Sequence, residues 1–182
     1  LRIFLFSRLK GLKIILFRMS KKSDSSSTPD LFDDVEFLVS IVNGGRGFPF
    51  VKDFQIVHRR SGIAKDYSRF HAASGVARLY LDNGPHLQDT IPFGQLLARS
   101  LSALDKGFDP PTILFKTLYQ FGRLEGHPIK QDWLAKLENR EQFEAIFRLN
   151  TKLSDMKPEK IMVMNLVNSL RSWLNTKTEL KC

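Results

Sequence analysis

Residues 46–80 read RGFPFVKDFQIVHRRSGIAKDYSRFHAASGVARLY, and the expected fold depends on how this stretch is divided. Residues 63–80 repeat apolar side chains every three or four positions, which predicts an amphipathic helix. The preceding segment is ambiguous, because Phe48 and Phe50 alternate as on a strand, whereas its later apolar residues also fit a short helix. Pro49 argues against a central strand at that point. The stretch therefore predicts one helix, preceded by an aromatic segment of undecided structure.

Downstream of this stretch, the chain reads as a succession of helices joined by short loops. The tetrapeptide DNGP at 82–85 predicts a turn. Apolar periodicity and helix-breaking residues then divide the remainder. They predict helices over about 90–106, 110–121, 128–149 and 158–174. The apolar phase slips near Asn139, so the third of these is either one bent helix or two.

Upstream, residues 28–42 also predict a helix, with Thr28 as a capping residue and acidic side chains in the first turn. Residues 20–29 are polar and low in complexity, as in a flexible linker. We therefore expect a mainly α protein: a single multi-helix domain of about six or seven helices over residues 30–182. A flexible basic and polar N-terminal arm is expected over residues 1–29.

Charge is distributed unevenly along the chain, whose formal net charge is +9. Residues 1–22 carry seven basic and no acidic side chains, and residues 46–80 carry seven basic and two acidic ones. Residues 23–45 carry five acidic side chains and no basic one. A basic excess favours partners rich in phosphate or carboxylate. The excess in residues 46–80 is the one that belongs to the expected folded domain.

The origin of residues 1–18 stays open between three explanations. They are upstream sequence translated in frame before Met19, the remnant of a larger precursor, or a targeting or membrane-surface segment. Charges interrupt the apolar run too often for a membrane-spanning helix. A mitochondrial presequence would fit the arginines and the lack of acids, although the basic residues scatter around a helical wheel. The expected localisation is the cytoplasm, or the virion if the protein is viral, with mitochondria as the alternative. Residues 1–22 are also the candidate contact with a membrane surface.

The sequence GGRG at 44–47 fits the GxxG pattern with which KH domains clamp a nucleic-acid backbone. An apolar pair precedes it and a helix-capable segment follows, which loosely resembles the KH arrangement. The chain departs from that family because no three-stranded sheet is found and Pro49 falls where the second KH helix should begin. The alternatives are a glycine-rich loop that offers N–H groups and Arg46 to a phosphate, and a plain turn.

The densest internal basic cluster is HRR at 58–60, together with Lys65 and Arg69. Its alternative is a solvated helix face, partly neutralised by Asp53 and Asp66. Cationic side chains attract phosphate, and aromatic faces stack on unpaired bases. The candidate phosphate contacts are Arg46, Lys52, Arg59, Arg60, Lys65 and Arg69. The candidate stacking residues are Phe48, Phe50, Tyr67 and Phe70.

The sequence contains no recognisable catalytic or cofactor motif. Its four histidines show no i, i+3 or i, i+4 pair, so no metal site is expected. Cys182 is its one cysteine, which excludes an internal disulfide. We therefore expect no enzymatic activity, no cofactor and no bound metal.

These features favour a non-catalytic RNA-binding or other nucleic-acid-binding protein that acts as a homo-oligomer. A compact helical body with a flexible polar arm and a basic groove resembles, in general terms, the nucleocapsid and coat proteins of RNA viruses. That resemblance implies self-assembly on RNA. One alternative is a structural or adaptor protein that binds other proteins or a membrane surface through its helices and basic N-terminus. Another is an enzyme of unrecognised type.

Overall fold

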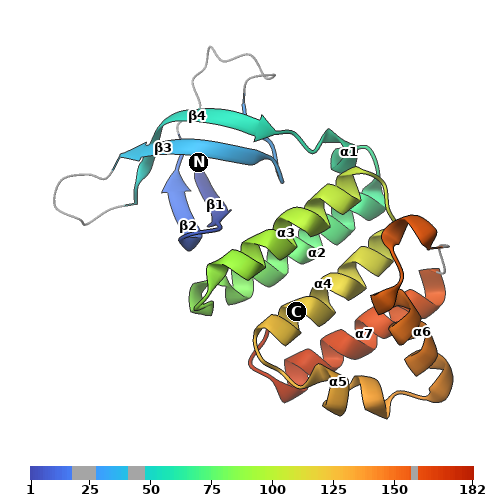
Figure 1. The fold of residues 1–182 in the computed structure, drawn as a ribbon. Coiled ribbons are helices and arrows are strands. Elements are labelled where there is room, and N and C mark those ends of the chain that lie inside the picture. Colours follow the sequence, from blue (N-terminus) through green and yellow to red (C-terminus); the bar gives the residue numbers. More distant parts are fainter. Residues whose placement is uncertain (18–27, 41–47, 157–159) are drawn as a thin grey trace.

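The computed structural model describes residues 1–17, 28–40, 48–156 and 160–182. Within these ranges it contains four strands and seven α-helices (Figure 1). The strands are β1 (Arg2–Ser7), β2 (Gly11–Leu16), β3 (Asp34–Ser40) and β4 (Phe50–His58). The helices are α1 (Ser61–Ala64), α2 (Tyr67–Asn83), α3 (Thr90–Asp105), α4 (Pro110–Leu124), α5 (Ile129–Asp132), α6 (Asn139–Asn150) and α7 (Lys160–Lys177). Short 3-10 turns are η2 (Gly84–His86), η3 (Leu134–Lys136) and η4 (Leu153–Asp155).

The expectation of a mainly α fold with a flexible N-terminal arm is wrong. The protein has a mixed α/β fold, in which helices account for 58% and strands for 17% of the described residues. The helix expected at residues 28–42 is replaced by β3, and the expected arm contains the hairpin β1–β2. The expected number of helices is confirmed. The helix expected at 128–149 is divided into α5, η3 and α6.

The four strands form one mixed sheet in the order β1-β2-β4-β3. It consists of two antiparallel hairpins, β1–β2 and β3–β4, whose inner strands β2 and β4 run parallel. The hairpins meet where Leu16 pairs with Phe50, and the Leu16 N–H donates to the Pro49 carbonyl at 2.8 Å. Pro49 therefore lies just before β4, at the edge of the strand pairing, where its missing N–H is tolerated.

β3 forms a strand because its apolar residues pack against side chains of the neighbouring strand β4. Val35, Phe37 and Val39 alternate along it, and the Phe37 ring lies 6.4 Å from the Phe54 ring of β4. Phe54 in turn lies 5.4 Å from Phe17, which follows β2. Such aromatic pairs stabilise neighbouring strands. The helix expected here rested on a different set, Leu31, Val35 and Leu38, which recur at helical spacing, so the choice between strand and helix depends on pairing with β4.

α4 lies at the centre of the helical layer, packed against α2, α3 and α7 (Figure 1). Its Phe115, Leu118 and Phe121 are fully buried. Tyr80 of α2 joins this core and donates its hydroxyl to the Phe93 carbonyl of α3 at 2.6 Å. Burial raises the pKa of Tyr80 well above its usual range. The β1–β2 hairpin reaches the same core, because the Phe6 ring packs edge-on against Tyr80 at 4.9 Å.

Aspartate side chains cap the starts of two of the long helices. Asp89 accepts a hydrogen bond from the Ile91 N–H at the start of α3, and Asp109 accepts one from the Thr112 N–H at the start of α4. These side chains satisfy N–H groups that have no partner within the helix. Among the helices of the described ranges, none has the length and apolar character needed to cross a membrane.

Candidate functional site: a basic pocket around Trp173

Arg60, a candidate phosphate contact, lies in the interior. Its side chain donates to both carboxylate oxygens of Asp34, at 2.8 and 2.6 Å, and to the Phe32 carbonyl. Only 3% of the residue is exposed. The Arg60–Asp34 ion pair connects the start of β3 to the residues that follow β4, so the guanidinium has a structural role within the fold.

Two further candidates, Arg59 and Arg69, also make contacts within the chain. Arg59 forms an ion pair with Asp33 at 3.5 Å and donates to the Thr28 carbonyl. Arg69 donates to the Gly62 carbonyl at 3.3 Å and lies against Gly107, where the guanidinium fills the space of a β-carbon. Arg59 thus links the end of β4 to the segment before β3, and Arg69 links α2 to α1 and to the turn after α3.

The other candidates are dispersed over the molecule. Lys52 and Lys65 are exposed on β4 and before α2, and Arg46 lies outside the described residues. Tyr67 is 81% exposed and stacks on His71, and Phe70 packs edge-on against Phe32. Phe48 and Phe50 lie by the sheet, far along the chain from α2, and the Arg2 guanidinium lies over the Phe48 ring. None of these residues lines either of the two hollows described below.

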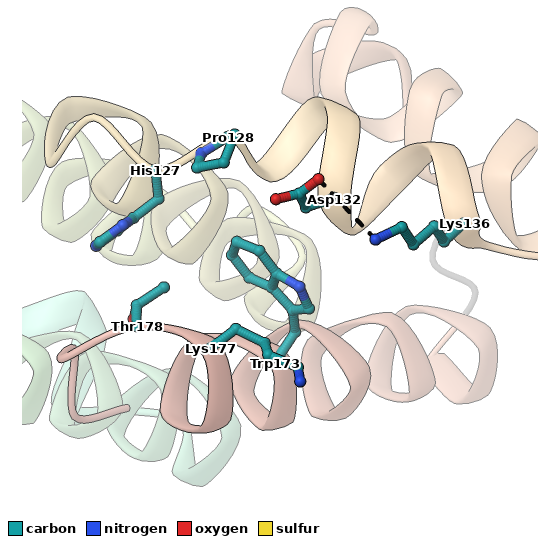
Figure 2. A pocket seen from close by; sticks show the side chains of 7 residues that line it. All are labelled: His127, Pro128, Asp132, Lys136, Trp173, Lys177 and Thr178. Atoms are coloured by element: carbon teal, nitrogen blue, oxygen red, sulfur yellow. Dashed lines mark ion pairs between the residues drawn. The ribbon is translucent and has the colours of Figure 1, made fainter.

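A different set of basic side chains meets at a pocket beside α7 (Figure 2). The pocket has a volume of about 350 Å³ and lies where the loop between α4 and α5 approaches the last turn of α7. Figure 2 shows the Trp173 ring standing between the α5 segment and the His127 side chain. The lining residues are His127, Pro128, Asp132, Lys136, Trp173, Lys177 and Thr178.

The loop that carries His127 is a helix cap with a defined hydrogen-bond pattern. The His127 N–H donates to the Gly122 carbonyl and the Gly126 N–H donates to the Arg123 carbonyl, both at 3.0 Å. This is the Schellman arrangement, which requires a left-handed residue after the helix. Gly126 supplies it with a φ of 84°. The cap therefore fixes where the chain turns and where His127 leaves it.

Trp173 differs from the other tryptophan in its surroundings. Trp133 is buried and donates its ring N–H to Ser169 at 3.1 Å. Trp173 is only half-buried: it packs against the helical core and also lines the pocket. A ring in this position has an aromatic surface available to a ligand.

Positive charge dominates the pocket and its surroundings. Lys136 forms an ion pair with Asp132 at 3.9 Å, while Lys177 lies in the last turn of α7, where the helix dipole favours a cation. An adjoining hollow, on the other side of His127 and Pro128, is lined by Arg123 and Lys130. Four Lys or Arg side chains thus stand against one lining carboxylate.

The pocket does not contain a histidine–carboxylate pair. Figure 2 shows His127 and Asp132 on opposite sides of the Trp173 ring, and the ion pair drawn for Asp132 is with Lys136. Close to the pocket, burial raises the pKa of the Glu125 carboxyl, and His127 opposes this shift. Across the described ranges, no three His, Cys, Asp or Glu side chains are grouped as metal ligands. The arrangement suits binding of an anion or an aromatic group.

The sequence pattern did not predict this pocket. Three of its cations come from consecutive elements, α4, α5 and η3, but Trp173 and Lys177 come from the end of α7, about 40 residues further along the chain. One local signal existed, since Gly126 and Pro128 mark a turn flanked by His127 and Lys130.

Comparison of the chain with protein-family models, with curated proteins and with solved structures found no match in any of the three.

Proposed function

We propose that this protein binds single-stranded nucleic acid, RNA in the first place, without catalysing a reaction, and that the pocket around Trp173 is the binding site. The observation that carries the proposal is the half-buried Trp173 ring in a pocket that Lys136 and Lys177 line. Single-strand-binding proteins combine these two elements, a stacking ring and a positively charged groove.

In this proposal, Trp173 binds a base, and the basic side chains of the two hollows bind the neighbouring phosphates. A base stacked on Trp173 would contribute about 1–3 kcal/mol. Lys136 and Lys177 would then neutralise the neighbouring phosphates, and Arg123 and Lys130 would bind the strand as it continues past His127. Asp132 holds Lys136 at 3.9 Å and so orients one of these cations.

The shape of the site also favours an extended ligand. Enclosed sites for small molecules are mostly apolar and bury nearly all of their ligand. Here the pocket is open and lined by polar groups, and a second hollow continues it. A strand that passes from one hollow to the next uses both, whereas a small substrate would occupy one.

Fluorescence anisotropy with a labelled oligouridylate of about 12 nucleotides tests the proposal, between about 50 and 200 mM salt. We expect Lys136→Glu with Lys177→Glu to weaken binding at least about tenfold and to flatten the salt dependence. Trp173→Leu keeps an apolar side chain but loses the stacking surface, so it should weaken binding about tenfold. Arg99→Glu makes the same charge change as either lysine variant alone and is the control for these single variants, because Arg99 is exposed on α3 and does not line the pocket.

Two outcomes would contradict the proposal. One is RNA affinity that the pocket variants leave at the level of the Arg99→Glu control. The other is a larger loss from Lys65→Glu than from the pocket variants, which would return the site to the basic cluster near α2. Duplex RNA of the same length should bind more weakly than the single strand, since its bases are already stacked on one another.

A second candidate function, a structural or adaptor protein, is supported by one observation. Phe143, Ile146 and Phe147 are exposed on α6 at the i, i+3 and i+4 spacing of a single helix face. Exposed apolar faces of this kind occur at protein–protein contacts. A chain with no measurable affinity for RNA at low salt would favour this second function.

A further inference from the structure

The β3–β4 ribbon leaves much apolar surface in contact with water. Every residue of both strands is exposed or half-buried. Leu38 is 63% and Val57 is 60% exposed, and Val39 and Phe50 are exposed as well. Figure 1 shows the ribbon standing apart from the helices, with the β1–β2 hairpin between them. The ribbon joins β2 through one residue pair, and a two-stranded ribbon alone is marginally stable in water, so a further strand would stabilise it.

The strand order gives that partner a place to bind. β3 and β1 are the two edges of the sheet, and an edge strand offers N–H and C=O groups to another strand. β1 is antiparallel to β2, β2 is parallel to β4, and β4 is antiparallel to β3. β1 and β3 therefore point the same way, and a second sheet laid beside the first would pair β3 with β1 in parallel.

The two edges carry opposite charge. β1 itself carries Arg2 and no acidic side chain, whereas β3 carries Asp34 and Glu36 and no basic one; residues 28–40 as a whole contain four acidic side chains. Within residues 28–40, Asp33 forms an ion pair with Arg59, and its side chain is almost wholly buried. The Asp34 side chain remains 49% exposed despite its pair with Arg60, and Glu36 is exposed on β3. Negative charge is thus still available at the β3 edge.

We infer that a second copy of this chain covers the β3 edge by adding its own β1 strand in parallel. Parallel pairing brings the start of β1, with Arg2, to the start of β3, with Asp34 and Glu36. The two-fold alternative, β3 against β3, is antiparallel and offers these acids no basic partner, because residues 28–40 contain no Lys or Arg. Because the contact joins two different surfaces, repetition produces a ring or a filament rather than a closed pair.

Sedimentation velocity across a hundredfold range of protein concentration, at low salt and without RNA, tests the inference. We expect the native sequence to associate in a concentration-dependent manner. Glu36→Lys and Arg2→Glu should each shift the midpoint to about tenfold higher concentration, because each replaces an attraction by a repulsion. The double variant exchanges the two charges and should restore association. Glu138→Lys and Arg140→Glu, at exposed residues just before and at the start of α6, make the same charge changes elsewhere.

Three results would overturn the inference. They are a native chain that stays monomeric at the highest concentration, single variants that match their α6 controls, and a double variant that stays as weak as the single ones. Circular dichroism confirms that each variant is folded. The inference stands apart from RNA binding: the double variant leaves the net charge and the pocket unchanged, so a short oligonucleotide measures the pocket separately.

Discussion

The role predicted for Arg60 from the sequence differs from its role in the structure. In the sequence it belongs to a basic cluster, and basic clusters favour phosphate binding. In the fold it is buried and donates to Asp34 and to the Phe32 carbonyl. The neighbouring Arg59 is exposed by 40% and pairs with Asp33 at the longer distance of 3.5 Å. Residue type alone could not separate the two roles, because they depend on which side of the chain faces the sheet.

This contrast predicts different stability losses for the two arginines. Arg60→Ala should lower the free energy of unfolding by about 2–3 kcal/mol, because it leaves Asp34 without its buried partner. The half-exposed Asp34 carboxylate keeps the loss below that of a fully buried pair. Arg59→Ala should cost less, about 1 kcal/mol, because the buried Asp33 carboxylate keeps its hydrogen bonds from the Asp30 and Arg60 N–H groups. Urea denaturation of both variants measures the difference, and equal losses would contradict the structural role assigned to Arg60.

At the scale of elements, helix ends were more predictable than strands. Asp89 and Asp109 cap α3 and α4, and Gly126 forms the turn that follows α4. Each of these features depends only on residues close by in the sequence. β3 was mistaken for a helix because its partner β4 lies beyond residues 41–47, and strand pairing is non-local. The pocket around Trp173 escaped prediction for the same reason, since its walls come from α4, α5 and α7.

Gly126 gives the element scale its own prediction. Gly126→Ala should lower the free energy of unfolding by about 1 kcal/mol, because the residue holds a φ of 84°. No heavy atom lies within 4 Å of the added β-carbon, so the loss would come from the backbone alone. Gly126→Asn should cost less, since asparagine tolerates the left-handed region. Thermal denaturation compares the two, and an alanine variant as stable as the parent would exclude the cap geometry.

At the scale of the whole molecule, the N-terminal hairpin is part of the fold rather than an arm. Ile15 is 2% exposed, Phe17 packs against Phe54, and Thr90 of α3 donates its hydroxyl to the Arg8 carbonyl at 2.7 Å. The sequence did not predict this role, because the same basic and apolar residues also fit upstream sequence, a precursor remnant or a targeting segment. Only contacts with residues far along the chain show the difference.

Ile15→Ala tests this placement. The variant should lose about 2–4 kcal/mol of unfolding free energy, as expected when a buried aliphatic side chain is truncated. Leu9→Ala is the control, because Leu9 is exposed at the hairpin turn and should be nearly neutral. A neutral Ile15→Ala variant would mean that the hairpin does not pack as described. Chemical denaturation of the two variants side by side gives the comparison.

The single pairing of Leu16 with Phe50 divides the sheet into two mechanical parts. Each hairpin has its own antiparallel ladder, while the parallel joint between them is brief. Opening that joint would release the β3–β4 ribbon and leave the β1–β2 hairpin on the helices. We therefore expect backbone amides of the β3–β4 ribbon to exchange with solvent faster than those of the helical core, with the change in rate at the β2–β4 pairing.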